Sequence, residues 1–479
     1  MTRPARGLAV ARRPAVAAAV TYLSQFLLVG LVLFFGGINS THGLFTLLLP
    51  PERIVEIYGS ADAGSYLSAA LNLIANGRIT PEFEWVYNLW PPGMVWLDAV
   101  IVRFSPLPFG VSLALVTAAA WAIALSLLVW PFVRRGKALG IVVLVELLIL
   151  ATSPFQSWMF DEGLLYADGI AAAMLMVALA LTATRLGAKG SWRDHVRDGI
   201  FVGIALAATV YFRASNNLVP ISFLVIAAVL GVMMIVRRAR HQNASALRPQ
   251  ILLIVTASFA AFALLLPYAA LVFHKHGRVQ FVQTENLVFD HAWHAREDPG
   301  RPQWIADAGA SLGCDLDARR CEEFAEERAA GTPPSPEELR DALIATILEH
   351  PGEWVIHRIA VVTRQWFGDE LSSYAHVETD YDRGPVSYSG SFNLNPPAGL
   401  AYLALLVLAF VTSVRLARRG SWAMLVIPVI ALALLAPFAI VHVEVRYLIP
   451  LKMIGLLTPL LMLQLRGDAD IRRSDPEPG

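Results

Sequence analysis

Long apolar runs alternate with short polar loops along most of the chain. A helix needs about 20 apolar residues to cross the hydrocarbon core of a bilayer. The runs at 138–153 and 199–212 are shorter, but both can extend into flanking residues. The pattern predicts an all-α polytopic membrane protein with about ten transmembrane helices. The candidate spans are 14–36, 109–132, 138–153, 165–184, 199–212, 215–236, 251–273, 396–415, 421–440 and 447–465.

Lys and Arg residues in the short loops predict the orientation, because cytoplasmic loops carry an excess of both. With the N-terminus inside, every dense basic cluster falls on the cytoplasmic side, and the C-terminus returns to that side as well. The first run is too long for a signal peptide, so we expect a retained first span. The clusters are Arg134, Arg135 and Lys137; Arg185, Lys189, Arg193 and Arg197; Arg237, Arg238 and Arg240; and Arg415, Arg418 and Arg419.

One further apolar stretch, residues 89–104, is left out of this set of spans. It contains Asp98 and Arg103, and counting it as a span would move every later basic cluster to the outside. We expect a partly embedded helix at the outer surface. Pro91 and Pro92 would stand at its start, where proline is tolerated.

Two large outer loops follow from this topology, at 37–108 and 274–395. The second is too long for a bare connection and should contain helices of its own. We expect one helix over residues 335–350 and an amphipathic interfacial one over 353–367, anchored by Trp354 and Trp366. The chain thus divides into a transmembrane module (1–273), an outer loop domain (274–395), and C-terminal helices with a cytoplasmic tail (396–479).

The composition supports a membrane class. The chain is 56% hydrophobic and 16% charged, with a mean hydropathy of +0.55, whereas soluble domains carry about 25% charged residues. A net charge of zero gives no indication of a nucleic-acid partner. Two cysteines exclude a disulfide framework. Cys314 and Cys321 both fall in the second outer loop, where an oxidising compartment would favour a local disulfide.

Asp62 and Tyr66 lie one helical turn apart, in the outer loop that follows the first span. A carboxylate at the membrane surface can act as general base for a hydroxyl acceptor. The simpler interpretation is a solvated acid at a helix N-terminus, where Asp is favoured in any case.

A second group of acids, Asp161, Glu162 and Asp168, crowds the short outer loop between two spans. Such acids can coordinate a divalent cation through oxygen ligands or act on a substrate. The alternative is an outer loop that is merely acidic. Asp168 is the strongest functional candidate of the three, because an acid at the edge of an apolar span is costly without a partner.

Basic and aromatic residues also stand at predicted outer ends of spans. Arg213 lies between two spans, Arg446 and Tyr447 open the last one, and Lys452 follows a turn or so deeper. Guanidinium groups suit phosphate oxygens, so these residues are candidates for binding a lipid phosphate. The alternative is snorkelling toward lipid head groups, which we favour for Lys452.

The order of these elements resembles the GT-C superfamily of polyprenyl-phosphate-dependent glycosyltransferases, which includes protein O-mannosyltransferases and aminoarabinose transferases. The resemblance covers about the first 270 residues well and the last hundred loosely, and order and topology carry more of it than any single motif. A tryptophan precedes the double proline where many relatives have histidine. The matching residues are Asp62, Tyr66, Gly77, Pro91 and Pro92; Pro154 with the acidic loop after it; and Arg446, Tyr447 and Pro450.

The resemblance implies a transferase of the cytoplasmic membrane with its active site on the extracytoplasmic face. Its donor would be a polyprenyl-phosphate sugar, its acceptor a lipid, glycan or protein, and its reaction an inverting transfer with Asp62 as base. Nucleotide sugars are absent outside, so a lipid phosphate fits as the donor. No paired acid stands beside Asp62, which leaves open whether a divalent cation, Mg²⁺ or Mn²⁺, takes part.

Three other functions remain open from the sequence. An O-antigen polymerase or ligase would be built on outer Arg and His residues, for which His350, His357, Arg358 and Arg364 are candidates. A flippase or transporter of lipid-linked sugars would place ionisable groups near mid-membrane and often contain inverted repeats. We find the acids at the boundary instead, and no repeat. A membrane scaffold without catalytic activity is the third alternative.

Overall fold

The computed structural model confirms a helical chain. Within the part of the chain that it describes, the only β contact outside helices is an isolated bridge between Gly368 and Leu394. The described residues are 14–39, 48–58, 62–135, 139–157, 162–185, 191–241, 245, 247–276, 344–345, 347–370, 394–418, 422–440 and 445–456.

Seven helices in the described ranges are long and apolar enough to cross a bilayer. Many of their large apolar side chains are exposed, as on α1, where Val16, Val20, Leu23, Leu27 and Leu31 recur at helical spacing. Such a surface fits lipid rather than water. The chain is therefore a multi-pass α-helical membrane protein. The seven are α1 (Pro14–Asn39), α7 (Phe109–Arg135), α11 (Ala167–Arg185), α12 (Trp192–Phe212), α13 (Leu218–Ala239), α14 (Leu247–His276) and α20 (Pro396–Arg418).

Three of the predicted spans are not among these seven helices. The run at 138–153 forms α8 (Leu139–Leu150), and the run at 421–440 forms η4 (Trp422–Leu425) followed by α21 (Val426–Ile440). Residues 445–456 form the first part of the last predicted helix. The short run at 199–212 does extend, because α12 begins at Trp192. A total of ten spans stays a prediction.

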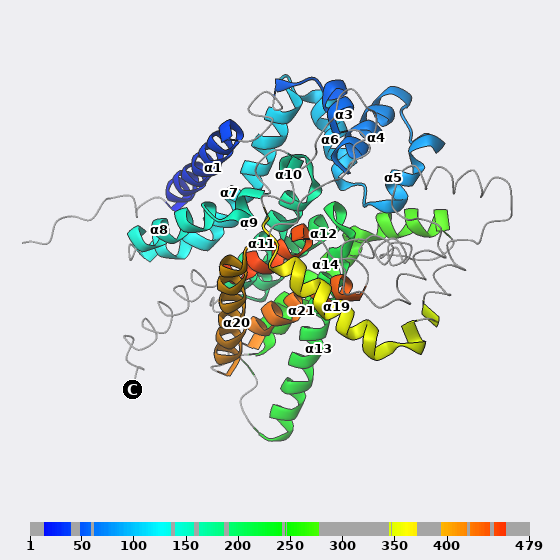
Figure 1. Cartoon of the computed structure of the whole chain (residues 1–479). Coiled ribbons are helices and arrows are strands. Elements are labelled where there is room, and N and C mark those ends of the chain that lie inside the picture. The colour runs from blue at the N-terminus through cyan, green and yellow to red at the C-terminus, as the bar shows by residue number, and fades with distance from the viewer. Residues whose placement is uncertain are drawn as a thin grey trace, which may run out of the picture.

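Small helices of the predicted first outer loop lie above the bundle, at the top of Figure 1. They share an apolar core built around Ile54, Leu67, Met94 and Val95. The helix that we expected after the double proline is present and begins at Gly93. The helices are α3 (Pro51–Tyr58), α4 (Asp62–Asn76), η2 (Pro81–Phe83), α5 (Glu84–Leu89) and α6 (Gly93–Phe104).

Gly93 brings α6 directly against the end of α12. A Cβ at this position would lie 2.4 Å from the carbonyl oxygen of Tyr211. No larger side chain fits without moving one of the two backbones. The outer helices are therefore docked on the bundle close to the point where α12 ends.

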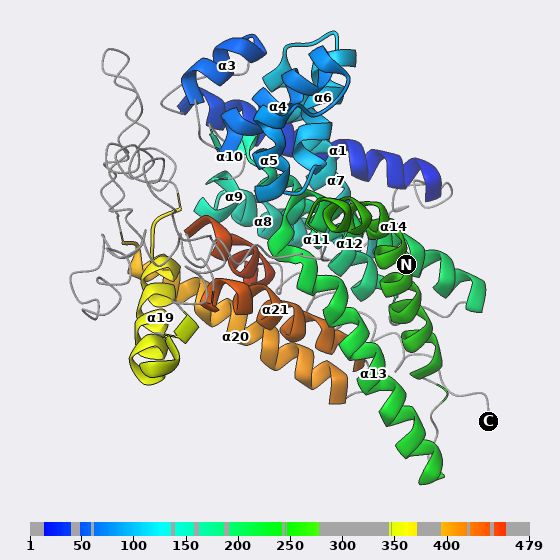
Figure 2. The same ribbon diagram turned by 90° about the vertical axis from the view of Figure 1, so that its right-hand side faces the viewer.

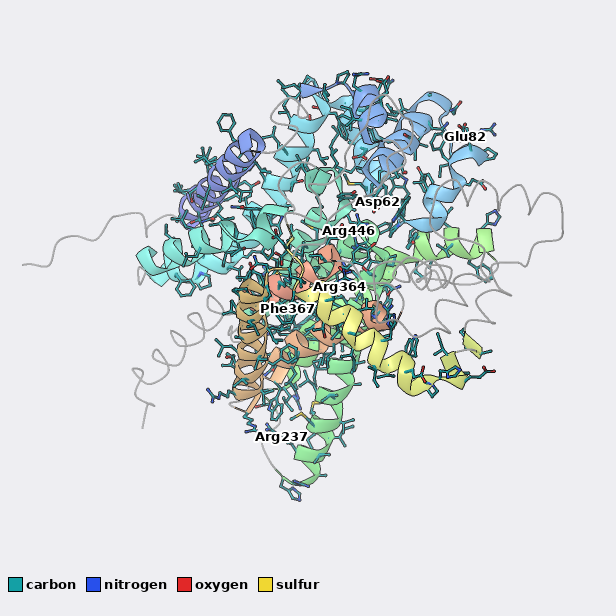
Figure 3. All side chains as sticks on the ribbon, in the orientation of Figure 1. Asp62, Glu82, Arg237, Arg364, Phe367 and Arg446 are labelled. Atoms are coloured by element: carbon teal, nitrogen blue, oxygen red, sulfur yellow. The ribbon has the colours of Figure 1, made fainter. Side chains whose placement is uncertain are left out.

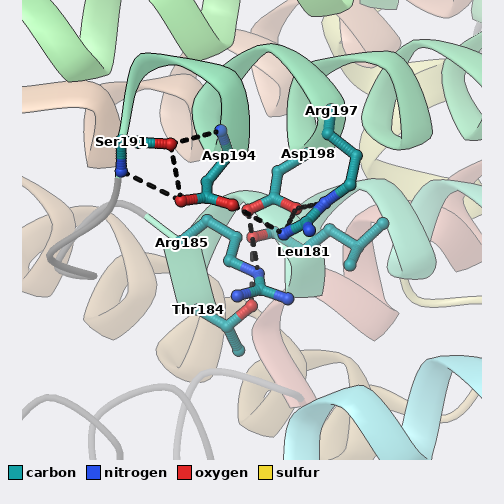
Figure 4. A network of polar contacts seen from close by, with 7 residues as sticks. All are labelled: Leu181, Thr184, Arg185, Ser191, Asp194, Arg197 and Asp198. Carbon is teal, nitrogen blue, oxygen red and sulfur yellow. Dashed lines mark hydrogen bonds and ion pairs between the residues drawn. The ribbon is translucent and has the colours of Figure 1, made fainter.

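The antiparallel pair α11 and α12 carries polar contacts at both of its ends. Figure 4 shows one end, where Arg185 Nε lies 3.3 Å from Asp198 Oδ2. There Ser191 and Asp194 cap α12 reciprocally: the Ser191 N–H donates to the Asp194 carboxylate at 2.9 Å, and the Asp194 N–H donates to the Ser191 hydroxyl. This capping box explains why the helix begins at Trp192.

Arg237 and Asp62 lie toward opposite ends of the bundle. Figure 2 shows α13 running away from the small helices α3 to α6. In Figure 3, Arg237 of the predicted inner cluster lies far from Asp62 of the first outer loop. That the Asp62 end faces outward stays a prediction.

A polar pair joins α1 and α8 within the predicted spans. Gln25 Nε2 donates to Glu146 Oε2 at 3.1 Å, and both side chains are buried. The other carboxylate oxygen of Glu146 has no hydrogen-bond partner among the described residues. We expected the acids at the membrane boundary, and the buried Glu146 contradicts that expectation. Its surroundings in 138–153 are so apolar that the single acid gave no periodic signal.

A helix is present where we expected one over 353–367, as α19 (Pro351–Trp366). Trp366 does not act as an anchor in the membrane interface, however. It is buried, and its Nε1 donates to the Gly399 carbonyl at 2.9 Å. Most of the helix expected over 335–350 lies outside the described residues, and so do Cys314 and Cys321.

Asp98, on α6, is an ionisable group buried in the outer helices. Its side chain is 1% exposed, and its Oδ1 has no hydrogen-bond partner among the described residues. Burial raises the pKa of this carboxyl well above its ordinary value. The folded protein therefore holds Asp98 in its neutral form at a pH where the unfolded chain has released the proton.

This shift predicts a loss of stability as pH rises. Between the ordinary and the raised pKa, the folded state binds one more proton than the unfolded state, so the free energy of unfolding falls with increasing pH. Asp98→Asn removes the titration while keeping the shape. Measured in detergent, the Asn variant should gain stability relative to wild type between about pH 5 and about pH 8. A constant difference across this range would contradict the assignment.

Candidate functional site

Four charged residues from four separate elements meet at one end of the bundle. Asp62 opens α4, Asp168 lies in the first turn of α11, Arg213 follows α12, and Arg446 lies at the start of the 445–456 helix. Arg446 Nη2 is 3.0 Å from Asp62 Oδ2, and Arg213 forms an ion pair with Asp168. Figure 3 shows Asp62 and Arg446 close together. We call these four residues the Asp–Arg cluster.

Tyr447 connects the two ion pairs. The Arg213 guanidinium carbon lies 4.1 Å from the centre of the Tyr447 ring, and that of Arg446 lies 5.1 Å from it. Arg446 Nη2 also donates to the Tyr447 hydroxyl at 3.2 Å. Both guanidinium groups are within cation–π range of one ring. Two positive and two negative side chains are thus gathered around a single aromatic residue, and their formal charges balance.

More aromatic residues enclose the cluster. The Arg446 guanidinium carbon is 4.7 Å from the centre of the Tyr166 ring. Tyr66 packs edge-on against Trp90, with ring centres 5.1 Å apart. Neither Tyr166 nor Trp90 was among the residues predicted for the site. Their positions in the sequence could have predicted them, because Tyr166 directly precedes α11 and Trp90 directly precedes the double proline.

Tyr66 is buried one turn beyond Asp62 on the same face of α4, as the spacing predicted. Its pKa is raised well above the ordinary value, chiefly by burial and then by the charge of Asp62, while Arg213 and Arg446 oppose the shift. The phenol therefore stays protonated and is a hydrogen-bond donor.

Local backbone structure explains why the charged residues stand where they do. An acid in the first turn of a helix is favoured by the helix dipole, which suits Asp62 on α4 and Asp168 on α11. Arg213 ends α12 with an extended backbone, φ −147° and ψ 115°, and η3 (Ala214–Asn217) follows directly. Because α11 and α12 are antiparallel, the start of the first and the end of the second lie side by side.

The two acids differ in exposure. The Asp62 side chain is 23% exposed, whereas that of Asp168 is 3% exposed. One carboxylate oxygen of Asp168 has no hydrogen-bond partner among the described residues. This difference favours Asp62 as the acid that meets a substrate, and it gives Asp168 the role of holding Arg213.

Lys452 lies apart from its expected partners. Its side chain is 1% exposed and forms an ion pair with Glu370, and its ammonium lies over the rings of Trp366 and Tyr402. The ammonium contacts Glu370 and two aromatic rings, and phosphate binding by Lys452, the less favoured of our two interpretations, stays a prediction. This environment excludes snorkelling, because the ammonium is enclosed by protein.

The acidic loop before α11 is described only in part. Asp161 lies outside the described residues, and Glu162 opens α10 (Glu162–Leu165), although its side chain is not described. A break at Tyr166 separates α10 from α11, so no continuous helix aligns this loop with Asp168. Within the described ranges, no group of three or more His, Cys, Asp or Glu residues could hold a metal ion. The Mg²⁺ or Mn²⁺ site stays a prediction.

The residues of the polymerase or ligase alternative are on or beside α19. His350 precedes the helix, His357 and Arg358 are buried, and Arg364 lies in its last turn.

Comparisons with protein-family models, with curated proteins and with solved structures found no match. Fold and site together define a multi-pass α-helical membrane protein with an Asp–Arg cluster at one end of its bundle.

Proposed function

We propose that this protein is a GT-C-like glycosyltransferase of the cytoplasmic membrane. It transfers a sugar from a polyprenyl-phosphate donor to a hydroxyl acceptor on the extracytoplasmic face. The observation that carries the proposal is the contact between Asp62 and Arg446, with Arg213 beside them around Tyr447. A candidate base and two candidate phosphate ligands are thereby within reach of one substrate.

The two arginines would hold the donor phosphate. Guanidinium groups bind phosphate oxygens through paired hydrogen bonds, and these bonds are strong because both partners are charged. The cluster stands where predicted spans meet the outer loop, which suits a phosphate whose prenyl tail remains among the helices. Tyr66 and Tyr447 supply further hydroxyl groups for the phosphate or the sugar.

Binding of the donor would also free the Asp62 carboxylate from its ion pair with Arg446. Without ligand, Arg446 is paired with Asp62. An incoming phosphate competes for the guanidinium, and the carboxylate is then free to take the proton of the acceptor hydroxyl. The acceptor oxygen attacks the anomeric carbon while the bond to the phosphate oxygen breaks on the opposite face. The phosphate leaves with the electron pair, and the anomeric configuration is inverted.

A direct binding experiment tests the phosphate step. Purified protein in nanodiscs is titrated with a polyprenyl phosphate and with the matching polyprenol, and binding is followed by native mass spectrometry. Charged hydrogen bonds contribute about 1.5–3 kcal/mol each, so the phosphate should bind at least about tenfold more tightly than the alcohol. Equal affinity for the two lipids would exclude the assigned role of the arginines.

A transporter or flippase of lipid-linked sugars is the second candidate. The observation in its favour is Glu146, an acid that is buried within the predicted spans and accepts a hydrogen bond from Gln25. Reconstituted vesicles distinguish the two functions. A transferase forms a new glycosidic bond, whereas a flippase moves the intact lipid between leaflets.

A further inference from the structure

The ion pair of Glu370 and Lys452 is the most enclosed pair of charges in the described part of the chain. Both side chains are 1% exposed. The Lys452 ammonium lies 5.4 Å from the centre of the Trp366 ring and 5.5 Å from that of Tyr402. Removing two charges from water costs about as much as their attraction returns, so a buried pair adds little net stability over apolar side chains. Its best-attested use is to fix register.

Glu370 belongs to a closely packed junction between α19 and α20. The Asn395 N–H donates to the Phe367 carbonyl at 2.7 Å, and Gly368 pairs with Leu394. A Cβ on Gly399 would lie 2.3 Å from the Phe367 ring, so this position admits no side chain. The junction gives Glu370 a fixed place from which to hold Lys452.

Lys452 lies on the same helix as Arg446 and Tyr447, six residues after the arginine. At about 1.5 Å per residue this separation is about 9 Å along the axis. The helix also approaches α20 closely, because a Cβ on Gly455 would be 3.0 Å from the Leu406 nitrogen. The part of the helix around Lys452 and Gly455 is therefore held by close packing, while its first turn carries Arg446 of the Asp–Arg cluster and Tyr447.

We propose that Glu370 and Lys452 are positioning residues for the donor site. Their ion pair sets the depth and rotation of the 445–456 helix, so that Arg446 meets Asp62 and Tyr447 meets Arg213. A shift of one residue would turn the first turn by about 100° and break both contacts. The link to the donor rests on the proposed function, whereas the link to the position of Arg446 does not.

The test replaces the ion pair by apolar side chains of similar size, with Glu370→Leu and Lys452→Met combined. Proximity is read in a Cys314→Ser, Cys321→Ser background that carries Asp62→Cys and Arg446→Cys, using a short bifunctional thiol reagent. We expect the apolar pair to keep its melting temperature but to lose most of the cross-link. With the natural Asp62 and Arg446, the apolar pair should lower kcat/KM for the donor about tenfold to a hundredfold, mainly through KM.

Two matched variants sharpen the result. Lys452→Arg keeps the charge, the ion pair and the ring contacts, and it should retain both cross-link and activity. Arg185→Met breaks a different ion pair at the other end of α11, about 25 Å from Asp168 by helix rise, and it should change neither readout.

A stable apolar variant with wild-type cross-linking would overturn the proposal. An apolar variant that fails to fold would also overturn it, because the pair would then act through stability alone. If cross-linking depends on the pair but the wild-type protein transfers no sugar from any lipid phosphate, the positioning role is supported and the proposed function is rejected.

Discussion

Replacing Asp62 by Asn is expected to lower kcat about a hundredfold to ten-thousandfold, which is the usual cost of losing a general base. Asn keeps the size of the side chain and can still accept a hydrogen bond from Arg446, so the fold should survive. Binding of the donor phosphate should persist, because both arginines remain. The loss should therefore appear in turnover rather than in donor affinity.

Single-turnover transfer in nanodiscs measures this effect, with thermal unfolding as a check on the fold. Glu82→Gln is the matched control, since Glu82 is an exposed acid on η2 in the same outer helices. It should leave transfer unchanged. Near wild-type turnover by a folded Asp62→Asn protein would exclude Asp62 as the base, and Asp168 and Asp161 would be examined next.

The second large effect is expected at Arg446. Arg446→Ala removes a charged hydrogen bond to the donor, worth about 1.5–3 kcal/mol, and should raise the donor KM or Kd about tenfold to a hundredfold. Arg446→Lys keeps the charge but not the forked geometry, so it should restore only part of the affinity. Arg103→Ala, an exposed arginine on α6, is the control.

Titration of polyprenyl phosphate against these variants measures the effect directly. Arg213→Ala should behave differently, because it leaves the buried Asp168 without its partner and so also destabilises the fold. Unchanged phosphate affinity in Arg446→Ala would remove Arg446 from the donor site.

Sequence patterns were sufficient to predict which residues share an end of the bundle. The length of each predicted span and the alternating direction of successive spans determine which residues share an end. Asp62, Asp168, Arg213 and Arg446 could therefore be grouped without a structure. Sequence patterns could not predict the ion pair of Asp62 with Arg446, because this pair depends on how α3 to α6 pack on the bundle through Gly93.

The dependence on tertiary packing also explains why the ion pair of Lys452 with Glu370 was not predicted. Its partner Glu370 lies 82 residues earlier in the chain, in a segment with no periodic apolar pattern. No spacing rule connects the two, and a lysine near a predicted helix end resembles an interfacial residue. Asp98 was visible as an acid in an apolar stretch, but its burial depends on tertiary packing.

The contact between Gln25 and Glu146 has a consequence for the order of assembly. An ionisable residue in the middle of an apolar helix costs about 3 kcal/mol when it enters the bilayer, and α8 has only 12 residues with which to offset that cost. Its partner is 121 residues earlier, so α1 is synthesised roughly ten seconds before α8 at ordinary ribosome speeds. The order of the chain therefore makes the amide partner of Glu146 available before α8 has been synthesised.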